Sequence, residues 1–195
     1  MRSASYDGAM SAQIEVELKA WVDDPEAMLM KIRELAELKE EVRYADTYWT
    51  YAHTQGYQHQ RFRLREYPGH AQVTAKVPVS PENPGANREH EFEVSDPEAF
   101  QAFCRAFGFR VLIRKEKQAR RFTLRERPAF PLTIELNYIL GLGHFLEVEA
   151  LVEDPAQVGA AQALVQTIFA RMGVPDSKIE PTPYTRLLYD LGKRG

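Results

Sequence analysis

Apolar and charged residues alternate strictly in a short stretch near the start of the chain, residues 14–19. Isoleucine, valine and leucine occupy its even positions, and the charged positions between them are Glu15, Glu17 and Lys19. Because successive side chains of a β-strand point to opposite faces, this pattern predicts a strand with one apolar and one charged face. The same alternation recurs in most of the later predicted strands, so we expect one charged face to extend across a whole sheet.

Strand-forming composition or alternation marks eight stretches of the chain. They are residues 14–19, 46–51, 61–65, 72–77, 89–94, 109–127, 132–137 and 145–152. An aspartate followed by proline opens each of three predicted helices, since the acid caps the first turn and proline suits its geometry. These helices cover residues 25–39, 97–108 and 155–172, a short fourth helix covers residues 184–191, and a long loop covers residues 78–87.

The order of these elements predicts an α+β fold, an eight-stranded antiparallel β-barrel with helices packed outside it. The amphipathic helices need an apolar surface, which only the apolar face of the sheet supplies. The charged face must then line the interior, where an eight-stranded barrel has room for side chains or for one extended ligand. We expect a single domain over residues 13–195, preceded by a disordered tail at residues 1–12.

The composition narrows the classes of function. A net charge of −3 gives no overall attraction to nucleic acid or membranes, and the basic residues are interleaved with acids. No stretch is long and apolar enough to span a bilayer, and the single Cys104 excludes an internal disulfide. We therefore expect a cytoplasmic protein with no nucleic-acid and no membrane partner.

Charges that line a barrel interior cost several kcal/mol each unless a ligand compensates them. Carboxylates suit Mg²⁺ or Mn²⁺, and arginine and lysine suit phosphate. The acids expected inside are Glu15, Glu17, Glu147 and Glu149, and the bases are Lys19, Arg61, Arg63, Arg65, Lys76, Lys115, Lys117 and Arg121. Tyr48 shares the charged face of its strand and is a further candidate contact. An interior with both charge types predicts a site for a metal-bound polyphosphate.

Several motifs also follow one another in the order of a known family. They are Glu15-x-Glu17-x-Lys19, Asp46-x-Tyr48, Arg63-x-Arg65, Lys76, the basic strand around Lys117, and Gly141-Leu142-Gly143-x-Phe145-x-Glu147-x-Glu149. With them the chain resembles the CYTH group, the triphosphate tunnel metalloenzymes, over nearly its whole length. Within that group, the ending at residues 183–188 and the tripeptide at residues 116–118 are most similar to the class IV adenylyl cyclases.

The resemblance implies a role for each matching residue. The metal ligands it implies are Glu15, Glu17 and Glu147, with Glu149 as a helper. The residues it implies for binding the triphosphate are Lys19, Arg63, Arg65, Lys76 and Lys117. The residues expected to carry catalysis are Glu15, Glu17, Lys19, Lys76 and Glu147. Three positions depart from the family pattern. Asn137 stands where many members have aspartate, Ala119 stands where an arginine is usual, and Arg88 is expected to face away from the tunnel. Arg121, on the same face as Ala119, could replace the missing arginine.

The function implied first is that of a class IV adenylyl cyclase, which converts ATP to cyclic AMP and pyrophosphate with Mg²⁺ or Mn²⁺. The same tunnel would serve a triphosphatase for thiamine triphosphate, a nucleoside triphosphate or inorganic tripolyphosphate. A non-catalytic polyphosphate or nucleotide binder is a further alternative. Related barrels often pair, so the resemblance is compatible with a homodimer.

Overall fold

The computed structural model of the protein describes residues 14–57, 60–78 and 87–193, with the backbone alone given for residues 76–78 and 87–89. Its strands form one eight-stranded antiparallel sheet in the order β1-β8-β7-β6-β2-β3-β4-β5, which confirms the predicted class of fold. The strands are β1 (Ile14–Val22), β2 (Ala36–Tyr51), β3 (Phe62–Tyr67), β4 (His70–Pro78), β5 (Asn87–Val94), β6 (Phe109–Leu124), β7 (Leu132–Ile139) and β8 (Gly143–Val152).

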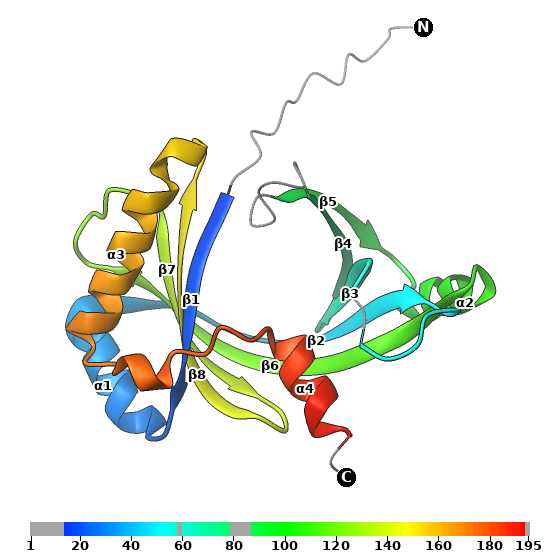
Figure 1. The fold of residues 1–195 in the computed structure, drawn as a ribbon, viewed down its shortest axis with the longest axis horizontal. Coiled ribbons are helices and arrows are strands. Elements are labelled where there is room, and N and C mark those ends of the chain that lie inside the picture. The colour runs from blue at the N-terminus through cyan, green and yellow to red at the C-terminus, as the bar shows by residue number, and fades with distance from the viewer. Residues whose placement is uncertain (1–13, 58–59, 79–86, 194–195) are drawn as a thin grey trace, which may run out of the picture.

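The sheet is strongly curved, and its two long strands β2 and β6 run along both arms of the curve (Figure 1). β7, β8 and β1 continue the sheet from the C-terminal part of β6, whereas β3, β4 and β5 continue it from the C-terminal part of β2. β1 and β5 end the strand order and stand on opposite arms. Within the described residues these two edges are not paired, so the expected barrel takes the form of a curled sheet with a concave face.

Three helices cover the convex side of the sheet, as the sequence predicts (Figure 1). α1 (Pro25–Leu35) and α3 (Val158–Arg171) share a core with the outward apolar residues of β1, β7 and β8. α2 (Pro97–Ala106) covers the other arm, where Phe100 packs against Phe62. With its apolar face covered from outside, the sheet turns its charged face towards the concave side.

The predicted starts are present for α1 and α2, whereas a 3-10 turn at Pro155–Gln157 precedes α3, which begins at Val158 and not at residue 155 as predicted. Asp24 accepts hydrogen bonds from the backbone N–H groups of Glu26 and Ala27, and Asp96 and Asp154 cap their turns in the same way. The first helix, however, ends at Leu35, not at residue 39 as predicted. Ala36 is already extended and pairs with Leu124, so pairing with β6 prevails over the local helical spacing. β2 therefore begins at residue 36 and not at residue 46.

The fourth helix, α4 (Tyr184–Leu191), has the predicted bounds but lies apart from the other three, across one end of the sheet next to β6 (Figure 1). Its Leu188 and Leu191 lie against Gly141 in the turn between β7 and β8. Thr185 shares a 2.9 Å hydrogen bond with Tyr57, in the connection between β2 and β3. α4 thus bridges the two arms at this end. The predicted N-terminal tail and most of the predicted loop at residues 78–87 lie outside the described residues.

Candidate active site on the concave face of the sheet

Charged side chains from neighbouring strands stand directly opposite one another on the concave face. Lys19 of β1 pairs in register with Glu147 of β8, Glu147 with Glu135 of β7, and Glu135 with Arg121 of β6. Directly opposed residues of antiparallel strands share a face, so these four side chains form one row across the sheet. The row brings predicted metal ligands and predicted phosphate contacts together.

Lys117 is the centre of the first cluster. Its Nζ atom lies 2.6 Å from Glu135 Oε2 and 2.7 Å from Glu147 Oε2, and Arg121 Nε lies 2.6 Å from Glu135 Oε1. Burial would lower the pKa of Lys117, but the two carboxylates hold it above its usual range. Burial would raise the pKa of Glu135, but Lys117 and Arg121 hold it well below its usual value. Lys117 and Glu135 are therefore both ionised near neutral pH.

Asp46 of β2 is the centre of the second cluster and is fully buried. Arg65 binds it through two hydrogen bonds, Nε to Oδ1 at 2.7 Å and Nη2 to Oδ2 at 3.0 Å. Lys115 Nζ lies 3.0 Å from Oδ2, and the Tyr48 hydroxyl donates to the same oxygen at 3.2 Å. Burial would raise the pKa of Asp46, but Lys115 and Arg65 lower it well below its usual value. Asp46 thereby fixes two cations on the concave face.

A third set of polar contacts on the concave face starts at Arg63 of β3, on the arm that also carries Arg65. Its Nη2 atom donates to Thr74 Oγ1 at 3.0 Å, and Thr74 Oγ1 lies 2.8 Å from Glu91 Oε1. Arg63 Nε is buried without a hydrogen-bond partner among the described residues. One donor of this guanidinium is therefore available to an anion.

Carboxylates gather on the opposite arm. Glu17 and Glu149 are directly opposed on β1 and β8, an arrangement that destabilises a sheet unless a cation lies nearby. Burial, together with the charges of Glu15, Glu17, Glu135 and Glu147, raises the pKa of Glu149 to about 7. Oxygen donors with this excess of negative charge fit a hard divalent cation such as Mg²⁺ or Mn²⁺. In the described part of the chain no three of these carboxylates already converge on one point.

Tyr184, the first residue of α4, also reaches the concave face. Its ring packs edge-on against Phe145, and the ammonium groups of Lys19 and Lys115 lie 5.4 Å and 5.6 Å from the ring centroid. Burial and the nearby Glu147 carboxylate raise the pKa of the Tyr184 phenol well above its usual range. The hydroxyl therefore keeps its proton at neutral pH.

The structure brings most of the predicted site residues together on one face. They are Glu15, Glu17, Lys19, Tyr48, Arg63, Arg65, Lys115, Lys117, Arg121, Glu147 and Glu149. Arg61 is not among them, because it precedes β3 and lies exposed, 4.8 Å from the Tyr51 ring. Lys76 and Arg88 lie on the paired strands β4 and β5, but their side chains are outside the described residues.

Sequence reasoning missed three contributors to this face. Glu135 has the same parity on β7 as Asn137, a signal that would have placed it inside. Asp46 was a motif residue without an assigned role. Tyr184 had no such signal, because its place depends on where α4 docks.

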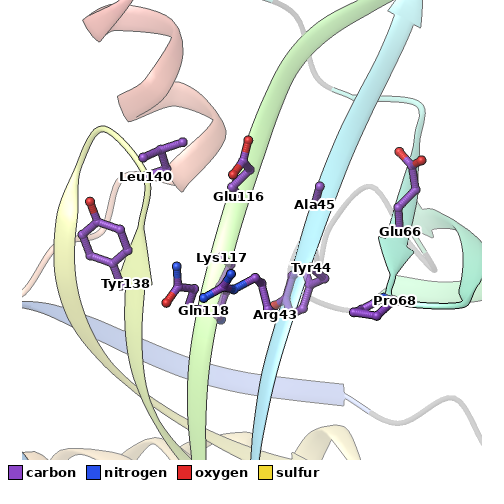
Figure 2. A pocket seen from close by; sticks show the side chains of 10 residues that line it. All are labelled: Arg43, Tyr44, Ala45, Glu66, Pro68, Glu116, Lys117, Gln118, Tyr138 and Leu140. Carbon is purple, nitrogen blue, oxygen red and sulfur yellow. The ribbon is translucent and has the colours of Figure 1, made fainter.

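Two hollows lie on the other face of the sheet. The first, of about 290 Å³, is lined by residues such as Arg43, Glu66, Glu116 and Tyr138 (Figure 2). The second, of about 390 Å³, adjoins it and shares Arg43, Gln118 and Tyr138. Tyr44 and Lys117 also line the first hollow, but most of its other residues on β2 and β6 have the opposite parity, so both hollows open on the convex side.

The chain belongs to the CYTH domain family, because the family model described as "CYTH domain" matches residues 13–184. Members of this family are generally cyclases or triphosphatases that bind triphosphates and use divalent metal ions. A comparison with curated proteins finds no match. None of the helices in the described ranges has the length and apolar character needed to cross a membrane.

Solved structures of similar fold cover nearly the whole chain. The PH1012 protein of Pyrococcus horikoshii is 25% identical with a TM-score of 0.72, over 90% of this chain and 99% of its own. A "putative adenylate cyclase" of Vibrio parahaemolyticus is 19% identical with a TM-score of 0.70, over 91% and 98%. HpAC1 of Hippeastrum, a "putative adenylyl cyclase" with "a dominant triphophatase activity", is 16% identical with a TM-score of 0.57, over 91% and 95%. At these lower identities the last two show the fold alone.

Proposed function

We propose that this protein is a divalent-metal-dependent enzyme that binds a triphosphate on the concave face and acts as a class IV adenylyl cyclase. The observation that carries the proposal is the division of charge on that face. A cationic group formed by Arg63, Arg65, Lys115 and Lys117 stands beside a group of carboxylates that includes the directly opposed Glu17 and Glu149. A metal-bound polyphosphate has both charges that such a face needs.

The cations would position the phosphate chain. Arg63 has a buried donor without a partner among the described residues, and Arg65 and Lys115 are held in place by Asp46. Lys117 and Lys19 stand next to Glu147, where phosphate oxygens would meet the carboxylate group. These residues would stabilise the charge that gathers on departing pyrophosphate, since phosphoryl transfer depends mainly on positioning and electrostatics.

The carboxylates Glu15, Glu17, Glu147 and Glu149 would hold Mg²⁺ or Mn²⁺. When bound, the ion would polarise the reacting phosphate and favour loss of the attacking hydroxyl's proton. In the cyclase reaction the ribose O3′–Pα bond forms, the bond from Pα to the bridging oxygen of pyrophosphate breaks, and the hydroxyl proton passes to solvent.

The position of α4 supports the cyclase over other activities. The segment at residues 183–188 carries the resemblance to class IV cyclases, and its Tyr184 reaches the concave face. The branch-specific part of the sequence thus adjoins the proposed site. By contrast, Glu116 and Gln118, which flank Lys117 in the other similar segment, lie on the convex side (Figure 2).

A second candidate, a triphosphatase, is favoured by a different aspect of the same helix. α4 lies across one end of the sheet, close to Glu147. A triphosphate that entered from the other end would bring its terminal phosphate next to this carboxylate, where water could attack it. The Hippeastrum protein is described as having a dominant triphosphatase activity, which is a further reason to compare the two activities in this protein.

A single product assay separates these functions. Purified protein is incubated with ATP and Mg²⁺ or Mn²⁺, and cyclic AMP, pyrophosphate and orthophosphate are resolved together. Cyclic AMP with an equal amount of pyrophosphate is expected. Orthophosphate without cyclic AMP would replace the cyclase with a triphosphatase, and thiamine triphosphate and tripolyphosphate would then be compared. Binding of tripolyphosphate without turnover of any of them would indicate a non-catalytic binder.

A further inference from the structure

Besides Arg63 Nε, two further buried polar atoms on the concave face have no hydrogen-bond partner in the part of the chain that the structure describes. They are the hydroxyl of Tyr184, a residue only 8% exposed, and Oδ1 of Asn137, a residue fully buried. Folded proteins pair nearly all buried polar groups, because an unpaired one loses its bonds to water without replacement. Both atoms lie beside the Glu147 carboxylate, and the Tyr184 hydroxyl interacts with Glu147 and Asn137 without a well-formed hydrogen bond to either, so its proton can be directed towards a ligand.

The surroundings of each atom define what that ligand must offer. Lys19 and Lys115 place their ammonium groups 5.4 Å and 5.6 Å from the Tyr184 ring centroid, so these two cations offset the Glu147 carboxylate that also lies near the hydroxyl. Asn137 Nδ2 donates to Glu147 Oε2 at 2.5 Å. Since a carboxylate only accepts, the amide must present its nitrogen there and leave Oδ1 as an acceptor for a cation or water.

We propose that Tyr184 contacts the substrate directly, its hydroxyl donating a hydrogen bond to a phosphate oxygen of the bound triphosphate. This inference rests on the proposed function and adds α4 to the binding site. Asn137 Oδ1 faces the positive partner of the same ligand, the hydrated cation that accompanies the triphosphate. Lys19 and Lys115 act with Tyr184, so the phosphate at the α4 end is held by one neutral donor and two charges.

The test uses Tyr184→Phe in the full chain, with Tyr189→Phe as the matched control. Tyr189 lies on the same helix, but its ring packs against Tyr57 and lies 4.8 Å from the ammonium group of Lys193, neither of which belongs to the candidate site. Affinity for inorganic tripolyphosphate with Mg²⁺ is measured by titration calorimetry, and stability without ligand by urea unfolding. We expect Tyr184→Phe to weaken tripolyphosphate binding about 10-fold or more, the usual value of a hydrogen bond to a charged group. Tyr189→Phe should bind as the wild type does.

The stability measurement distinguishes a ligand contact from a structural role. Removing an unpaired buried hydroxyl leaves the ligand-free protein as stable as before or more so. Removing a hydroxyl with a structural role would lower the free energy of unfolding. Equal tripolyphosphate affinity in wild type and Tyr184→Phe would overturn this inference while leaving the proposed function intact. Failure of the wild type itself to bind tripolyphosphate would overturn both. A loss of stability that matches the loss of binding would also overturn it.

Discussion

Asp46 is a buried carboxylate whose charge is balanced by the neighbouring cations. Arg65, Lys115 and Tyr48 all bind it, and the Arg65 guanidinium also lies 3.8 Å from the Tyr44 ring centroid. Such a buried network is costly to assemble but more costly to break, because the partners that remain are left buried and uncompensated. Asp46 therefore acts as a positioning residue that holds two substrate-binding cations on the concave face.

Asp46→Asn should destabilise the protein by about 3–5 kcal/mol, because it keeps the shape but leaves Arg65 and Lys115 without their counter-charge. Urea unfolding at pH 7 measures the change. The control is Glu41→Gln, which removes an exposed ion pair with Arg120 and should alter the free energy of unfolding by about 0.5 kcal/mol or less. Equal effects of the two variants would contradict the structural role of Asp46.

Glu149 makes the stability of the metal-free protein depend on pH in the opposite direction to a salt-bridged acid. Its pKa is raised to about 7 in the folded protein and lies near its ordinary value of 4.5 when unfolded, so folding takes up a proton between these values. Stability is then highest below about pH 4.5 for this group and is lost as the pH rises to about 7. Glu149→Gln removes this dependence.

We therefore expect Glu149→Gln to be more stable than the wild type at pH 8, by about 1–3 kcal/mol, and to approach it at pH 5. Urea unfolding in the presence of a chelator, at several pH values, gives the comparison. Glu153→Gln, an exposed position beyond the end of β8, serves as the control. A constant difference between Glu149→Gln and wild type at all pH values would show that Glu149 has no such coupling to folding.

At the scale of elements, local alternation was enough to assign most strands and their faces, because the strand period is a property of the backbone itself. It could not locate what depends on pairing. The register that places Lys117 between Glu135 and Glu147 needs the neighbouring strands. The extension of β2 back to Ala36 likewise follows from pairing with β6, and Arg61 lies just outside β3, whose register with β2 ends at Phe62.

The turn between β7 and β8 requires glycine at residue 141, where φ is +85°, in the left-handed region. Gly141→Ala should cost about 1–2 kcal/mol from backbone strain, since the added methyl group itself would meet Leu188 and Leu191 only at ordinary contact distance. Gly159→Ala, in α3 with open space around it, should instead stabilise the protein by about 0.5 kcal/mol. Urea unfolding compares the two, and changes of the same sign would show that residue 141 does not need the left-handed conformation.

At the scale of the whole molecule, the concave face carries a group of acids and a group of bases, and the glutamates of β5 adjoin the bases. β1 and β8 contribute mainly carboxylates, whereas β3 contributes arginines and the middle strands β2 and β6 hold the lysines and Asp46 between them. A metal ion alone would be attracted by the acids but repelled by the nearby cations. A polyphosphate alone would be attracted by the cations but repelled by the acids. Only the two together complement both the acids and the bases, so each should raise the affinity for the other.

This predicts a stabilisation by Mn²⁺ and tripolyphosphate together that exceeds the sum of their separate effects. With the pair at about a hundredfold excess over its dissociation constant, mass action raises the free energy of unfolding by about 2.7 kcal/mol. Thermal or urea unfolding with each ligand alone and with both measures the difference. The matched variant is Glu17→Gln, which should abolish the excess while retaining the effect of tripolyphosphate alone, since Glu17 belongs to the group of acids. Purely additive effects would mean that the metal and the phosphate chain occupy independent sites, and the concave face would then not bind them as one ligand.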